Sequence, residues 1–163
     1  MALPAFPNPV NELSARLVAG GVVVMALATI VLDLEWMTAV LAYGFVARVL
    51  AGPRFSPLAL LVTRFVTPAL PVHGRLVPGP PKRFAQLLGA VFSVTAAILT
   101  FGLDRFDLAE LVLAVLLVPA SLEAFAGFCV GCQIFGWLMR AGVIPESVCE
   151  ECSDISRRVG ATA

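Results

Sequence analysis

Charged residues are scarce in this sequence. Only 13% of its 163 residues are Asp, Glu, Lys or Arg, whereas soluble domains contain about a quarter. Hydrophobic residues make up 60% of the chain, and the mean hydropathy is +0.95. This composition is typical of a membrane protein, and the length allows one domain. Eleven basic residues balance eleven acidic ones, so the sequence predicts no nucleic-acid partner.

Side chains that commonly carry catalysis are also few. His73 is the single histidine, and we interpret it as a surface-loop residue rather than a ligand or a proton carrier. The sequence has no nucleophile–base–acid set and no glycine-rich phosphate-binding loop. It therefore leaves open whether the protein is an enzyme and gives no substrate.

Long apolar runs predict an all-α, polytopic membrane protein. A helix crosses a ~30 Å hydrocarbon core with about 20 residues. Four runs approach this length, at about 13–32, 36–52, 84–103 and 108–128. The third run carries a stripe of small residues that would let a neighbouring helix approach closely: Ala85, Gly89, Ser93 and Ala97.

The four spans are interpreted as two pseudo-repeated hairpins, each followed by a short membrane-surface helix. The first surface helix is expected at about 55–70, although that segment could instead span the membrane, and a basic Pro/Gly-rich loop follows at 71–83. The second is expected at 133–141, with Gly142 as its stop signal. We therefore divide the chain into a transmembrane region, 1–128, and a four-cysteine region with a charged tail, 129–163.

Basic residues predict the orientation in the membrane. With four spans, one face of the membrane receives ten of the eleven basic residues and the other face receives only Arg105. The ten are Arg16, Arg48, Arg54, Arg64, Arg75, Lys82, Arg83, Arg140, Arg157 and Arg158. Since Lys and Arg concentrate on the cytoplasmic side, both termini are expected to be cytoplasmic.

Two charges fall inside the predicted spans. Aligning Arg48-Val-Leu-Ala-Gly52 with Glu123-Ala-Phe-Ala-Gly127 places a basic and an acidic side chain at about the same depth. A charge inside a membrane is costly and usually has a partner. We therefore expect Arg48 and Glu123 to form an ion pair. The alternative is that Arg48 extends to the interface and Glu123 finds a local partner.

The four cysteines of the chain form two C-x-x-C pairs, Cys129/Cys132 and Cys149/Cys152, separated by sixteen residues. This spacing lies in the range of tetrathiolate zinc sites, so Zn bound by all four is one interpretation. The second is a redox-active dithiol that exchanges electrons or sulfur with a soluble protein. The third, inert small residues at an interface, fits paired motifs poorly. A cytoplasmic position argues against permanent structural disulfides.

The two pairs differ in their surroundings. Acidic residues surround Cys149 and Cys152, which opposes thiolate formation there; they are Glu146, Glu150, Glu151 and Asp154. We therefore assign Cys129 and Cys132 as the catalytic pair and Cys149 and Cys152 as a resolving or structural pair.

The motif Phe128-Cys-Val-Gly-Cys132, followed by Ile144-Pro145 and Cys149-Glu-Glu-Cys152, resembles a bacterial membrane family, domain-of-unknown-function family 4395. The likeness extends to Asn8-Pro-Val-Asn11 and to Gly52-Pro-Arg-Phe-Ser-Pro57. The resemblance implies a polytopic protein of the bacterial inner membrane, associated with thioredoxin- or rhodanese-type proteins, and brings no established activity.

We therefore expect membrane-bound thiol/disulfide or sulfur-transfer chemistry with a soluble thioredoxin- or rhodanese-like partner. One alternative is a non-catalytic membrane module whose structural four-cysteine zinc site docks a partner. Another is a small permease for a sulfur compound.

Overall fold

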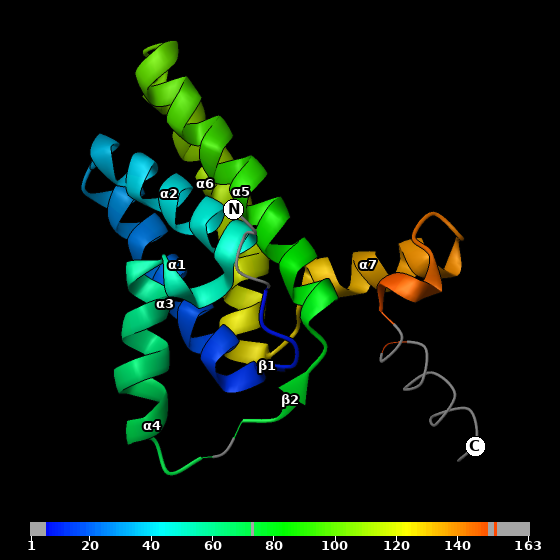
Figure 1. The fold of residues 1–163 in the computed structure, drawn as a ribbon. Helices are drawn as coiled ribbons and strands as arrows, with labels where there is room; N and C mark the ends of the chain where they lie inside the picture. The colour runs from blue at the N-terminus through cyan, green and yellow to red at the C-terminus, as the bar shows by residue number, and fades with distance from the viewer. Residues whose placement is uncertain (1–5, 73, 150–151, 153–163) are drawn as a thin grey trace.

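A computed structural model describes residues 6–72, 74–149 and 152. His73, Glu150, Glu151 and the charged tail lie outside the described residues. In the part described, four helical runs are long and apolar enough to cross a membrane, which agrees with the predicted all-α membrane protein (Figure 1). They are Glu12–Val31, Glu35–Ala69, Gly79–Gly102 and Phe106–Ala126.

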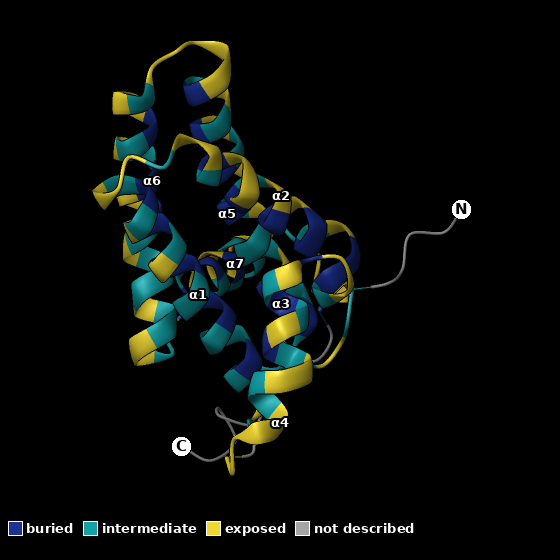
Figure 2. Cartoon of the chain, turned by 90° about the vertical axis from the view of Figure 1, so that its left-hand side faces the viewer, coloured by how far each residue is buried: buried dark blue, intermediate teal, exposed yellow. Residues whose placement is uncertain are grey.

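Four helices pack in a closed ring, in which each contacts the next: α1 (Glu12–Val31), α2 (Glu35–Ala51), α5 (Gly79–Gly102) and α6 (Phe106–Ser121). Its interior combines small residues, of which Ala26, Ala96 and Ala109 are fully buried, with large apolar ones such as Leu41 and Leu113. Many other large apolar residues are exposed, including Val24, Val91 and Leu111. Figure 2 shows exposed positions along the outer faces of the helices. This distribution is typical of a helical bundle that faces lipid tails.

The small-residue stripe of α5 lies at helix contacts. A Cβ at Gly89 would overlap the ring of Phe45 on α2, and Ala85 lies against Gly131. Ser93 is fully buried. The missing side chains let these helices approach closely.

Helix α1 begins where the sequence predicts. The side chain of Asn11 caps it by accepting hydrogen bonds from the amides of Leu13 and Ser14, at 2.9 and 3.4 Å. A two-residue strand, β1 (Val10–Asn11), pairs antiparallel with β2 (Leu76–Val77). The pairing fixes the start of α1 beside the start of α5.

The basic loop is shorter than predicted. Helix α5 begins at Gly79, whereas the sequence analysis extended the loop to residue 83. Pro80 and Pro81 account for the error, because proline suits the first turn of a helix, where its missing N–H needs no partner. Lys82 and Arg83 consequently belong to the helix.

The segment expected as a membrane-surface helix at 55–70 packs along the bundle. It consists of a 3-10 turn, η1 (Gly52–Arg54), then α3 (Pro57–Leu61), a π-helical turn η2 (Val62–Val66) and α4 (Thr67–Ala69). Leu58 lies over Gly21, and Thr67 hydrogen-bonds Ser14 at 3.0 Å. These contacts show that the segment runs antiparallel to the first half of α1. It packs there because apolar residues such as Val62 are buried in the contact.

The last span ends earlier than predicted. After Ser121 the chain makes a π-helical turn, η3 (Leu122–Ala126), and Gly127 ends it with a φ of 68°. Helix α7 (Val130–Arg140) then leaves the bundle sideways (Figure 1). Gly142, with a φ of 75°, follows it as the predicted stop, and a 3-10 turn, η4 (Glu146–Val148), leads to the second cysteine pair.

Candidate thiol site at the end of the bundle

The end of α6 has an irregular backbone that leads to the first cysteine pair. Pro119 lies inside α6, where it removes a helical N–H, and the π-helical turn η3 follows three residues later. Arg16 of α1 holds this end by donating to the carbonyl of Phe125 at 3.0 Å. Such π turns are frequent at functional sites.

Glu123, in the π turn, has a different partner from the one predicted. Its Oε1 lies 2.6 Å from Nζ of Lys82, and the two side chains are 13% and 9% exposed. The expectation of an Arg48–Glu123 ion pair is corrected by this contact. Because α5 starts at Gly79, Lys82 lies in the first turns of this helix, where its side chain contacts the Glu123 carboxylate.

Arg48 is buried close to that pair, with a residue exposure of 5%. Its Nε donates to Gln86 at 2.8 Å and its Nη1 to Ser56 at 3.0 Å. Its guanidinium lies 4.4 Å from the ring centroid of Phe45, a cation–π arrangement. Among the described residues, no carboxylate lies within ion-pair distance of Arg48.

Cys129 is the N-cap of α7, and its Sγ accepts a hydrogen bond from the amide of Cys132 at 3.3 Å. The hydrogen bond with Cys132 lowers the pKa of Cys129. Burial and the nearby Glu123 carboxylate oppose this shift, the charge of Lys82 adds to it, and the net direction is downward. That hydrogen bond and burial raise the pKa of Cys132. A low-pKa thiol at a helix N-terminus with a partner three residues on is the arrangement of a nucleophile and a resolving thiol.

Close packing fixes the position of this pair. A Cβ on Gly131 would lie 2.6 Å from the Cα of Ala85 on α5. Only glycine therefore lets the first turn of α7 rest on the α5 backbone.

The second pair is joined by a disulfide between Cys149 and Cys152, whereas Cys129 and Cys132 are free. The structure contains this bond, and the expectation that a cytoplasmic position disfavours permanent disulfides stays a prediction. The bridge closes only a short loop, and short loops gain little from the chain-entropy stabilisation of a disulfide. Within residues 6–72, 74–149 and 152, no group of three His, Cys, Asp or Glu is placed to hold a metal.

The four cysteines thus do not form a tetrathiolate group as the chain is folded here. Zinc ligation needs thiolates, and the disulfide removes two of them. Zinc ligation by the four cysteines stays a prediction.

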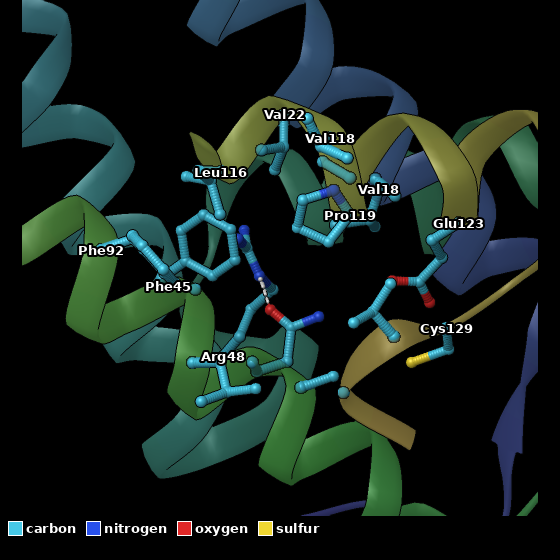
Figure 3. Close-up of a pocket in the computed structure, with 18 of the residues that line it drawn as sticks. Val18, Val22, Phe45, Arg48, Phe92, Leu116, Val118, Pro119, Glu123 and Cys129 are labelled. Carbon is cyan, nitrogen blue, oxygen red and sulfur yellow. Dashed lines mark hydrogen bonds between the residues drawn. The ribbon is translucent and has the colours of Figure 1, made fainter. Parts of the chain in front are cut away.

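A partly open cavity lies beside these groups. Its volume is about 480 Å³, and it is lined by residues of α1, α2, α5 and α6 and of the first turn of α7. Figure 3 shows Glu123 and Cys129 on one side of it and Phe45, Arg48 and Phe92 on the other. Most of its lining is apolar, and Arg48, Gln86, Glu123 and Cys129 are its polar or reactive residues.

The family model described as "Domain of unknown function (DUF4395)" matches residues 10–140 of the chain. The chain belongs to the DUF4395 family. No curated protein and no solved structure matches it. The part that matches DUF4395 contains Cys129 and Cys132 and ends before Cys149 and Cys152.

Sequence reasoning singled out Cys129, Arg48 and Glu123, which the structure places on one cavity. It did not predict that Lys82 and Gln86, which lie one helical turn apart on α5, contact Glu123 and Arg48. The signal for Lys82 was present, because Pro80 and Pro81 mark a helix start just before it. The roles of Arg16 and Gly131 depend on contacts between distant segments, for which the sequence has no local signal.

Proposed function

We propose that this DUF4395 protein carries out thiol–disulfide exchange or sulfur transfer through Cys129 and Cys132, with a soluble thioredoxin- or rhodanese-like partner. The observation that carries the proposal is the position of Cys129. Its sulfur caps α7, accepts the Cys132 amide hydrogen bond and is electrostatically coupled to Lys82. Each of these features favours the thiolate, which is the form that attacks disulfides.

The exchange has two steps. The Cys129 thiolate attacks a disulfide of the partner, forming a mixed disulfide and releasing one partner thiolate, which takes up a proton. Cys132 then loses its proton and attacks Cys129 Sγ, which forms the Cys129–Cys132 disulfide and releases the second partner thiol. The reverse sequence reduces the protein. Cys149 and Cys152 are bonded to each other as a disulfide and take no part in these two steps.

We also propose that the protein lies in the bacterial inner membrane with both termini and the thiol site on the cytoplasmic face. The support is the distribution of basic residues along the sequence, in which four spans would leave ten of the eleven on one face of the membrane. The hairpins α1–α2 and α5–α6 are proposed to be pseudo-repeats, since each leads into a π-helical turn, η2 and η3 respectively.

Trapping of the mixed disulfide tests the thiol proposal. The reduced full-length protein in lipid nanodiscs is treated with an aromatic disulfide reagent. In Cys132→Ser, Cys129 should retain one reagent group, since no second thiol displaces it. In Cys129→Ser, labelling at Cys132 should be at least about tenfold slower, because its thiol lacks the features that favour the thiolate. Equal labelling rates in the two variants would contradict the assignment.

Metal analysis of the same preparation tests the alternative of a structural zinc site. Its sequence support is the C-x2-C-x16-C-x2-C spacing. One bound zinc per chain, with four thiols protected until a chelator is added, would replace the dithiol proposal.

A further inference from the structure

The cavity beside Cys129 has the size and lining of a binding site for a small organic molecule. Its volume of about 480 Å³ lies within the range of ligand pockets, about 300–1,000 Å³. Such pockets are mostly apolar, with a few polar groups that orient the ligand. Here Val22, Phe92 and Leu116 supply apolar wall, and Arg48 and Gln86 supply the polar groups (Figure 3).

Arg48 indicates what kind of group the ligand carries. It is a buried cation at 5% exposure, and among the described residues no carboxylate lies within ion-pair distance of it, because Glu123 is bonded to Lys82. Its Nε and Nη1 have partners, Gln86 and Ser56, whereas its Nη2 makes no hydrogen bond to a described residue. No buried side-chain nitrogen or oxygen in the described part lacks a partner, so Nη2 is not fully buried, and Arg48 is one of the residues that line the cavity. An oxygen that carries or develops negative charge would complete this donor set.

The opposite wall indicates what the ligand does. Cys129 lines the cavity, and the Lys82–Glu123 pair lies beside it. A dithiol that becomes a disulfide gives up two electrons and two protons. A molecule held between Cys129 and Arg48 is therefore placed to accept the two electrons of the dithiol. Because most of the cavity lining is apolar, most of that molecule must be apolar as well.

We propose that the cavity binds a lipid-soluble quinone, and that the Cys129–Cys132 dithiol passes its electrons to it. This inference rests on the proposed thiol function and names the electron acceptor of the same site. Arg48 and Gln86 hold one quinone oxygen, with the ring in the apolar space next to Phe45 and Phe92. The quinone class fits because its ring is apolar, its carbonyl oxygens accept hydrogen bonds, and those oxygens gain negative charge on reduction.

The reaction balances without another reagent. An S–S bond forms between Cys129 and Cys132, and both S–H bonds break. The two electrons pass to the quinone ring, and the two thiol protons end on its two oxygens, giving a hydroquinone. Glu123 is the carboxylate beside Cys129 that can carry a proton between sulfur and oxygen. A reduced soluble dithiol then restores Cys129 and Cys132 by the exchange described above.

Anaerobic mixing of the reduced full-length protein in nanodiscs with a short-chain ubiquinone or a naphthoquinone tests the electron transfer. Quinone absorbance and free thiols are followed together. We expect one quinone reduced for every two thiols lost, and no reduction by Cys129→Ser or Cys132→Ser. Thiols that stay reduced in the presence of quinone would overturn the proposal.

Quinone binding is measured separately in the redox-inactive double variant Cys129→Ser/Cys132→Ser, by equilibrium dialysis. Adding Arg48→Met should weaken binding about tenfold or more, the loss typical of a hydrogen bond to a charged group. Arg105→Gln is the matched control, since Arg105 lies in an exposed turn and pairs with Asp107, and it should leave binding unchanged. Ala19→Leu is the second variant, used in case Arg48→Met does not fold. It fills the cavity without removing a polar group and should abolish binding.

The outcomes separate this inference from the proposed function. Disulfide exchange with the soluble reagent but no quinone binding would overturn the quinone site and leave the thiol function standing. Quinone binding that Ala19→Leu and Arg48→Met do not weaken would place the quinone elsewhere and also overturn the proposal. Failure of both quinone reduction and reagent exchange would refute the thiol function itself.

Discussion

Gly131, inside the first C-x-x-C motif, provides a sensitive test of how the thiol site is held. A Cβ at this position would lie 2.6 Å from both Cα and Cβ of Ala85, and 3.3 Å from the Ala85 amide nitrogen. Carbon atoms pack best at about 3.5–4.0 Å. Because two of the three opposing atoms belong to the α5 backbone, no side-chain rotation relieves the overlap. Gly131→Ala must therefore push α7 away from α5 by about 1 Å.

The expected cost follows from overpacking, about 1–3 kcal/mol. Alanine also favours the helix over glycine by up to about 1 kcal/mol, which partly hides that cost. Gly136→Ala is the matched control, because Gly136 lies in the same helix and a Cβ there would have no atom within 4 Å. The helix-propensity gain cancels between the two variants, so their difference in unfolding free energy should be about 1–3 kcal/mol.

Two readouts are compared in the same detergent: thermal unfolding and the rate of Cys129 alkylation. We expect Gly136→Ala to be as stable as the original protein or more stable, with unchanged alkylation. Gly131→Ala should be less stable, and Cys129 should be alkylated at a different rate because its position at the N-cap shifts. Equal stability and equal alkylation in the two variants would refute the close α5–α7 contact.

Three further predictions concern the charges and caps of the bundle. Because the pKa of Cys129 is lowered, the pH at which its alkylation rate is half-maximal should lie below about 8.5, the pKa typical of a free cysteine. Lys82→Met should move that pH midpoint upward. A midpoint at or above the free value would contradict the assignment. Lys82→Met or Glu123→Gln alone leaves a buried charge unpaired and should cost about 3–5 kcal/mol in unfolding free energy, whereas the double variant should recover most of it; additive losses would refute the pair. Asn11→Ala removes the cap of α1 and should cost about 1 kcal/mol, measured by thermal unfolding against Asn11→Asp, which keeps a capping oxygen and should retain the stability.

The spans and their ends could be predicted where local chemistry decides them. Asn11 caps α1 because its side chain bonds amides two and three residues away, and Gly142 follows α7 at a positive φ. The start of α5 was predicted wrongly, because the prolines before Lys82 were interpreted as loop residues. Prolines fit equally well in the first turn of a helix, so the local sequence alone does not distinguish a loop from a helix start.

The candidate site could be predicted only in part. Cys129 and Cys132 follow from their spacing, and the burial of Arg48 and Glu123 follows from their positions in apolar runs. The partner of each charge depends on which side chain reaches it across the bundle. Lys82 lies 41 residues from Glu123 along the chain, and no periodicity connects them. The cavity likewise exists only because α1, α2, α5 and α6 close into a ring and α7 covers one side.

Mass-spectrometric mapping of the cysteines in the native, full-length protein tests the central claim most directly. After reduction, one equivalent of a two-electron oxidant is added in nanodiscs and the remaining thiols are alkylated. Our account predicts that this single equivalent forms a Cys129–Cys132 disulfide, which reduction reverses, so that neither of these two cysteines is alkylated. Four thiols that resist both reagents until zinc is chelated would contradict it.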